Sequence, residues 1–221
     1  MTCPIGGCSF AEMPDRPVID ARLFWRADWD ASVVTLEAVP VSSDDPDAFD
    51  IRRFAEVATV LRHGDAHESL LFSDGVHHLQ FEIVAGSVMA GPVRLHYRLP
   101  GFRLVEIQTL TLRRLAQFWR LGRFSPSLFP PEPRARRWIM ALQAYDGMIA
   151  GASHRDIAVA LFGDKAVRDD WTGHSDYMRS RVRRSVYAGC ALVRGGYRDV
   201  LRGTGTAAWT ETTKGSGVEP P

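Results

Sequence analysis

The segment "GASHRDIAVALFG" (residues 151–163) predicts a short capped helix, and after eleven residues it is followed by the arginine-rich stretch "SDYMRSRVRRSVYAGCALVRGGYRDVL" (residues 175–201). Ser153 can accept a hydrogen bond from the free backbone amides at the start of a helix, and Asp156 lies where the helix dipole favours negative charge. Gly163 is a typical helix end. A short capped helix followed by a basic helix is typical of helix-turn-helix domains.

The short helix has an apolar side that suits packing against its neighbours. We expect the small Ala160 to let another helix approach closely, and three side chains to face inward, namely Ile157, Ala158 and Leu161. Residues 164–174, "DKAVRDDWTGH", are longer than the three- or four-residue turn of the compact motif. We therefore expect an expanded helix-turn-helix in which Val167 and Trp171 pack beneath the connection.

The arginine-rich stretch predicts a helix near residues 175–194 with two different sides. Steps of about 100° per residue place one apolar stripe on Met178, Val182, Val186, Gly189 and Val193. The opposite side holds Tyr177, Ser180, Arg183, Arg184 and Tyr187, with Arg179 and Arg181 at its margins. Since burial of an unpaired guanidinium group is prohibitive, Arg183 and Arg184 must face water, an acidic protein surface, or phosphates and guanine edges. These outer residues, together with Arg155 of the preceding helix, are the candidate DNA-binding residues.

Residues 134–149 predict the first helix of this C-terminal region. One helical stripe, which we expect to be buried, carries Trp138, Ile139, Leu142, Tyr145 and Ile149. Gly151 is a suitable end for that helix. A stiff linker precedes it, because prolines steer the residue before them out of helical geometry and four of them occur close together: Pro126, Pro130, Pro131 and Pro133.

The N-terminal half has the pattern of a small sheet. Four short runs rich in β-branched and aromatic residues predict strands at 32–41, 68–75, 77–86 and 92–99. The sequence Ser73-Asp74-Gly75 predicts a hairpin turn between two of them, because glycine tolerates a positive φ. The stretch at residues 50–64 suits either a short helix or a strand.

The chain is therefore expected to be an α+β protein, with a small, mostly antiparallel N-terminal sheet followed by a helical domain that contains the expanded helix-turn-helix. The expected regions are an irregular lead-in (1–20), an acidic β-rich domain (21–100), a helix with a proline-rich linker (101–133), a helix-turn-helix-like domain (134–202) and a disordered tail (203–221). The helix before the linker suits packing on one side, because apolar residues recur at three and four positions: Leu112, Leu115, Phe118 and Trp119.

Charge divides the chain into two unlike halves. Residues 1–100 carry 8 Lys and Arg against 15 Asp and Glu, a net charge of −7. Residues 134–202 carry 13 against 7, a net charge of +6. A basic C-terminal half favours an anionic partner, and an acidic N-terminal half suits either a different partner or a shield for the first.

No pattern predicts a metal site, a bound cofactor or an enzyme. The cysteines lack a second ligand pair, a glycine interrupts the first histidine pair, and adjacent residues of a strand point to opposite faces. Neither a nucleophile elbow nor a nucleotide-binding glycine pattern is present. The candidates weighed are Cys3 with Cys8, His63 with His67, His77 with His78, and the Ser, His and Asp of "TGHSDY" (172–177).

The chain shows no membrane signal. It has no run of about 18 apolar residues, and its N-terminal sequence lacks the basic start and apolar stretch of a signal peptide. Three scattered cysteines do not make a disulfide framework. We therefore expect a soluble cytoplasmic protein, associated with the nucleoid if it binds DNA.

The C-terminal residues resemble the RovC-like DNA-binding domain family of proteobacteria. The resemblance is carried by "ALQAYDGMIAGASHRDIAVALFG", by "RDDW" and by the arginine-rich stretch with its closing "GGYRDVL", and it extends back to "LFWRADWD", so that it spans roughly residues 21–202. Members are transcriptional regulators, some of secretion systems and others of integrative conjugative elements. The resemblance implies DNA binding through the third helix, with the basic segment matched by Arg179, Ser180, Arg181, Arg183 and Arg184.

The sequence thus predicts a regulator of transcription that reads double-stranded DNA in the major groove with the arginine-rich helix. A single such module has a small interface, so a homo-oligomer on a repeated site is expected. The alternative is a protein-binding antiactivator or adaptor, which would use the same helix to hold a second regulatory protein without contacting DNA.

Overall fold

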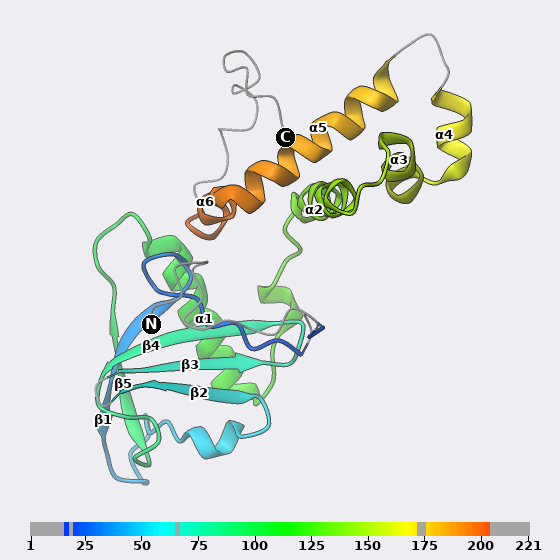
Figure 1. Cartoon of the computed structure of the whole chain (residues 1–221). Helices are drawn as coiled ribbons and strands as arrows, with labels where there is room; N and C mark the ends of the chain where they lie inside the picture. The colour runs from blue at the N-terminus through cyan, green and yellow to red at the C-terminus, as the bar shows by residue number, and fades with distance from the viewer. Residues whose placement is uncertain (1–15, 18–19, 65–66, 172–175, 204–221) are drawn as a thin grey trace. The chain divides into compact units, whose positions relative to one another are not determined.

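The computed structural model describes residues 16–17, 20–64, 67–171 and 176–203 (Figure 1). The chain forms two compact units, Met1–Pro130 and Pro131–Pro221. The predictions for Cys3 and Cys8, for nearly all of the lead-in and for the tail beyond Gly203 lie outside the described residues. The first unit contains a sheet and the second contains helices, so the α+β class is confirmed.

The sheet of the first unit has five strands in the order β2-β3-β4-β1-β5. β1 pairs with β4 in parallel, and every other neighbouring pair is antiparallel, so the mostly antiparallel sheet is confirmed. The strands are β1 (Val34–Pro40), β2 (Ala58–His63), β3 (His67–Ser73), β4 (His78–Ala85) and β5 (Val93–Arg98).

Two short connections between strands follow from local side chains. Residues 50–64 contain both structures that the sequence allowed: a single helical turn, η1 (Ile51–Phe54), and then β2. The Asp50 side chain caps that turn by accepting a hydrogen bond from the Arg52 backbone amide at 3.0 Å. The hairpin between β3 and β4 is confirmed, and Gly75 has a φ of 90° in its turn.

Helix α1 (Val105–Leu121) lies against one face of the sheet (Figure 1). Its Leu115 and Phe118 are buried in the same core as the inner face of the strands. The Phe118 ring lies 5.0 Å from that of Phe72 on β3 and 4.8 Å from that of Phe54, measured between ring centroids. The segment after α1, which contains the short turn η2 (Pro126–Leu128), adds Phe124 to this core. The predicted one-sided helix is therefore confirmed.

Helices make up the second unit, and one of them replaces the predicted long turn. The elements are α2 (Ala135–Ile149), α3 (His154–Phe162), α4 (Asp164–Asp170), α5 (Tyr177–Ala191), a wide helical turn η3 (Leu192–Gly196) and α6 (Tyr197–Leu201). Of the residues predicted as a long turn, Asp164–Asp170 form α4, which starts directly after Gly163, and residues 172–174 lie outside the described residues. Val167 of α4 is fully buried, as expected, while the helix-turn-helix assignment itself stays a prediction.

The buried side of α2 differs from the predicted stripe. The small residues Ala141 and Ala144 are buried, whereas Ile139, Leu142 and Ile149 are 55%, 40% and 67% exposed. The stripe prediction was wrong for these three residues because α5 contacts α2 on the side of Ala141 and Tyr145, whereas Trp138 and Tyr145 of the same stripe are half-buried. Two further predictions of inward-facing residues were wrong, since Ala160 of α3 and Val193 of η3 are exposed.

A glycine in the first unit shows how tightly β1 and β4 are joined. Gly86, directly after β4, has a φ of +75°, and a Cβ added there would lie 1.9 Å from the carbonyl oxygen of Ala38 in β1. The register of the parallel pair also shifts between Leu36 and Glu37. Only glycine fits this approach of two backbones.

Substitution of Gly86 by alanine is expected to destabilise the protein by more than about 3 kcal/mol, because the new Cβ must push β1 and β4 apart. The matched control is Gly64→Ala, since Gly64 has a similar φ of +62° with open space around it. That control is expected to cost roughly 1 kcal/mol of backbone strain. Equilibrium urea unfolding measures both, and equal losses would contradict the close approach at Gly86.

Candidate nucleic-acid interface

The inner side of α5 fixes how this helix is rotated. Met178, Val182 and Val186 are buried, as the apolar stripe predicted. They share one core with residues from the three other helices, namely Ala144 of α2, Ile157 and Ala158 of α3, and Val167 of α4. Figure 1 shows α3 and α4 beside the N-terminal half of α5. The opposite side of α5 must therefore face outward.

The second contact that holds α5 is an unusually close approach to α2. A Cβ added at Gly189 would lie 2.2 Å from the carbonyl oxygen of Ala141 and 2.7 Å from the Cβ of Tyr145. The α5 backbone therefore rests directly on α2. This contact explains why the small Ala141 and Ala144 are the fully buried residues of α2.

The outward side of α5 carries the predicted arginine and tyrosine residues. Arg183 and Arg184 are exposed, and among the described residues they form no hydrogen bond or ion pair. Tyr177 and Tyr187 are 58% and 50% exposed, and Ser180 is half-buried between them on the same side. Five of the eight candidate residues thus lie together on one accessible helix side.

The two arginines at the margins of that side are held by neighbouring aromatic residues. The guanidinium carbon of Arg181 lies 4.1 Å from the ring centroid of Phe162, the last residue of α3. Arg179 donates a hydrogen bond to the Trp171 carbonyl oxygen at 3.3 Å, and its guanidinium carbon is 5.9 Å from the Trp171 ring. Its Nη1 also lies 3.3 Å from Oδ1 of the exposed Asp176.

Arg155 lies on another helix, exposed in the first turn of α3. The predicted cap of that helix is confirmed as a capping box. The Ser153 hydroxyl accepts from the Asp156 amide at 3.2 Å, and the Asp156 carboxylate accepts from the Ser153 amide at 3.1 Å. The Ser153 hydroxyl also donates to the Asp156 carboxylate at 2.6 Å, and this hydrogen bond first, then that of the Ser153 amide, lowers the pKa of Asp156. No hydrogen bond or ion pair in the described part of the chain joins Arg155 to the α5 residues.

Sequence reasoning missed the role of Phe162. Its position at the end of an apolar helix favoured core packing, and nothing local marked it as a partner of an arginine nineteen residues later. Trp171 was expected to pack beneath the connection, and it does pack partly against the core of the second unit. A usable signal was that Phe162 and Trp171 each follow an apolar helix stretch or a polar segment at a helix end, while the basic helix that comes after both carries an arginine at each margin of its outward side.

Two of the histidine pairs considered as metal ligands have other partners among the described residues of the first unit. His63 and His67 face each other across β2 and β3, and His63 Nε2 lies 3.0 Å from the Ser69 hydroxyl. His77 pairs instead with Asp74, with 3.0 Å between Nδ1 and Oδ2. Within residues 16–17, 20–64, 67–171 and 176–203, no three His, Cys, Asp or Glu side chains gather closely enough to hold a metal ion.

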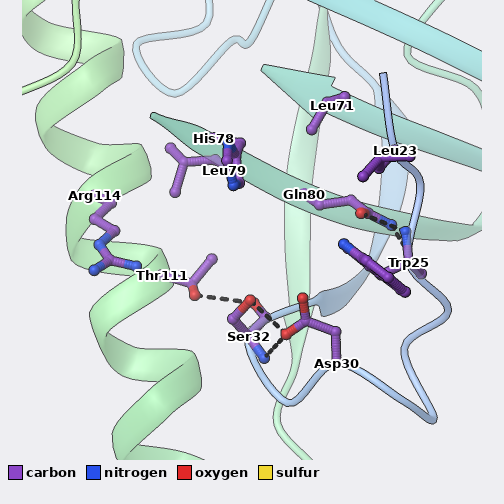
Figure 2. A pocket seen from close by; sticks show the side chains of 10 residues that line it. All are labelled: Leu23, Trp25, Asp30, Ser32, Leu71, His78, Leu79, Gln80, Thr111 and Arg114. Carbon is purple, nitrogen blue, oxygen red and sulfur yellow. Dashed lines mark hydrogen bonds between the residues drawn. The ribbon is translucent and has the colours of Figure 1, made fainter. Parts of the chain in front are cut away.

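The first unit has a small pocket, lined by both polar and apolar side chains, between its N-terminal segment, β4 and α1 (Figure 2). Its polar groups largely satisfy one another. The Gln80 side chain exchanges two hydrogen bonds with the Trp25 backbone, and the Thr111 hydroxyl donates to the Ser32 carbonyl at 2.9 Å. Arg114 donates to the Leu128 carbonyl at 2.9 Å, and burial lowers its pKa. A volume of about 40 Å³ suits water and is far below that of typical ligand sites.

None of the described helices is long and apolar enough to cross a lipid bilayer.

Residues 98–202 match the model of a protein family described as RovC_DNA-bd: T6SS, transcription factor, DNA binding domain. The match begins at the last residue of β5 and includes α1 and all the described helices of the second unit. The resemblance proposed from the sequence is thereby confirmed over this segment, while residues 21–97 lie outside the match. No curated protein matches the chain closely enough to count as a relative.

Gly189→Ala is expected to destabilise the protein by about 2 to 3 kcal/mol, because the added methyl group meets the α2 backbone, which cannot move without separating the helices. The matched control is Gly147→Ala, also inside a helix, where the new Cβ meets only the Ile157 side chain at 3.0 Å. Alanine raises intrinsic helix stability by about 1 kcal/mol at both sites. Urea unfolding distinguishes them, and a stabilised Gly189 variant would contradict the close packing of α5 on α2.

Proposed function

Because residues 98–202 belong to the RovC DNA-binding domain family of transcription factors, we propose that this chain regulates transcription by binding specific DNA sequences with the outward side of α5. The observation that carries the proposal is the pair Arg183 and Arg184, exposed and without partners among the described residues. A folded chain that leaves adjacent guanidinium groups unpaired on one helix favours an anionic partner.

The proposed mechanism uses two kinds of contact. Arginine forks bind phosphate oxygens and set the position of the helix on the duplex, without reading sequence. In the major groove, Arg183 or Arg184 pairs with the O6 and N7 atoms of guanine, and the Ser180 hydroxyl contacts a neighbouring base edge. The net charge of +6 over residues 134–202 supports this function by drawing the unit toward DNA.

The proposal includes a second copy of the chain. One helix that presents a few side chains to a groove gives a small interface, and dimers on repeated half-sites are the common solution. A candidate contact surface is the apolar stripe of α2, formed by the exposed Ile139, Leu142 and Ile149. Pairing two such stripes would remove apolar area from water.

The proposal also places the protein in the cytoplasm, in association with the nucleoid. It further holds that the protein is not an enzyme, since DNA binding of this kind needs no catalysis. The alternative function is that of an antiactivator, in which Arg183 and Arg184 bind an acidic surface of another regulator. The same arginines serve both functions, so DNA titration decides between them.

Titration of the full chain with duplex DNA from its own upstream region is expected to give an affinity that falls linearly in log salt concentration. Arg183→Ala and Arg184→Ala are each expected to lower the affinity by about 5- to 100-fold where the side chain contacts a base. A variant that loses a phosphate contact is expected to have a salt slope smaller by about one. The matched control is Arg168→Ala, whose exposed arginine is already paired with Asp164 of the same helix at 2.5 Å.

Absence of DNA binding at low salt would overturn the DNA-binding proposal and favour the antiactivator. Binding that is equal for operator and unrelated duplexes would contradict sequence-specific reading but not DNA binding.

Light scattering of the DNA-bound protein is expected to give a mass that contains more than one chain. The double variant Ile139→Ser with Leu142→Ser is expected to lower that mass, because polar side chains weaken an apolar contact. Val76→Ser serves as the control, since Val76 is 68% exposed in the first unit. A single chain on DNA in the unchanged protein would refute the oligomer.

A further inference from the structure

The arginine run of α5 contains two structurally different pairs. Arg183 and Arg184 are exposed and unengaged among the described residues. Arg181, by contrast, is half-buried with its guanidinium group over the ring of Phe162, at 4.1 Å. Arg179 contacts both the carbonyl oxygen and the ring of Trp171, and it also pairs with the exposed Asp176 at 3.3 Å. The second pair therefore has a defined orientation in the absence of any ligand.

We propose that Phe162 and Trp171 are positioning residues that hold Arg181 and Arg179 ready to bind DNA phosphates. This inference rests on the proposed DNA-binding function. Phe162 and Trp171 touch no DNA in this arrangement and act only through the arginines that they hold.

Stacking suits this role because of the shape of the guanidinium group. The group is flat, and its five N–H donors lie in its plane. An aromatic ring covers one flat face and leaves the in-plane donors free for a phosphate. An arginine side chain loses much rotamer freedom when it binds, and this loss is smaller when a ring already restricts it. Because the Phe162 ring already restricts the Arg181 side chain in the folded protein, Arg181 loses less rotamer freedom when it binds DNA.

The fold explains how both rings reach α5. Phe162 ends α3, and Gly163, with a φ of +86°, turns the chain directly into α4. Val167 is fully buried in the shared core and fixes α4 there. Trp171 follows at the C-terminal end of α4. The helix that replaces the expected turn therefore sets one ring at each of its ends, against α5.

The rival explanation is that the stacked pair only fastens α3 to α5. A double-mutant cycle separates the two explanations, because a fastening ring matters for binding whether or not residue 181 carries a guanidinium group. The variants are Phe162→Leu, Arg181→Ala and their combination, each titrated with duplex DNA at several salt concentrations. Phe102→Leu is the control for the substitution itself, since Phe102 is 94% exposed in the first unit.

Phe162→Leu is expected to weaken DNA binding by about 3- to 10-fold with an unchanged salt slope, because Arg181 still neutralises its phosphate but must be ordered on binding. Arg181→Ala is expected to lower the slope by about one. The combined variant is expected to bind no more weakly than Arg181→Ala alone. Arg181→Lys avoids any change in the core and is expected to behave like Phe162→Leu, since lysine keeps the charge without the flat group.

An equal loss of affinity from Phe162→Leu in the presence and absence of Arg181 would overturn the inference and leave DNA binding standing. Unchanged affinity of Arg181→Lys would overturn it as well. If the unchanged protein fails to bind DNA, the proposed function is refuted, and the inference with it. A second readout needs no DNA, because NMR relaxation measures the motion of each arginine Nε–H group. The Arg181 group is expected to be more rigid than those of Arg183 and Arg184, and to become mobile in Phe162→Leu.

Discussion

The contact between Gly189 of α5 and the backbone of Ala141 in α2 determines the orientation of the surface that matters most. A backbone contact this close requires a residue without a Cβ at position 189, and the face of α2 opposite it carries the small Ala141 and Ala144 and the Cβ of Tyr145. With that side of α5 fixed, Met178, Val182 and Val186 enter the core, and the arginines between them are turned outward. The exposure of Arg183 and Arg184 is thus a consequence of packing on the other side of the helix.

The same close contact explains which helix faces could be predicted from the sequence. On α5 the apolar and charged residues alternate with helical spacing, and the buried side followed directly from that pattern. On α2 the larger apolar residues lie on one stripe, yet its fully buried residues are the alanines that face α5, and Ile139, Leu142 and Ile149 are exposed. Hydrophobic periodicity reports where apolar residues lie, and it does not report how near the next helix comes.

Helix α4 and the contacts of Phe162 and Trp171 with the α5 arginines could not be predicted from the sequence, for a different reason. The segment "DKAVRDD" is short and polar, and only Val167 in it is fully buried, so it carries no repeating pattern that could mark a helix. The contact of Arg181 with Phe162 joins residues of separate helices, and it exists only after α4 has set the distance between them. Contacts set by the pattern of a single helix were predictable here, and contacts between side chains of two different helices were not.

The sheet was predictable strand by strand, since each strand has its own β-branched run and turn, but the parallel partner of β1 was not visible in local sequence.

The place of β1 in the middle of the sheet has a consequence for how the chain reaches its native state. β1 is the first strand in the sequence, and both of its neighbours, β4 and β5, come after β2 and β3. During synthesis it must wait, unpaired, until those later strands have left the ribosome. The meander of β2, β3 and β4 can form from local contacts, whereas insertion of β1 closes a long loop, and long loops slow folding. The largest helix contact of the second unit, between α2 and α5, also joins segments that are separated in sequence by α3 and α4, so both units contain a pairing that local contacts alone cannot make.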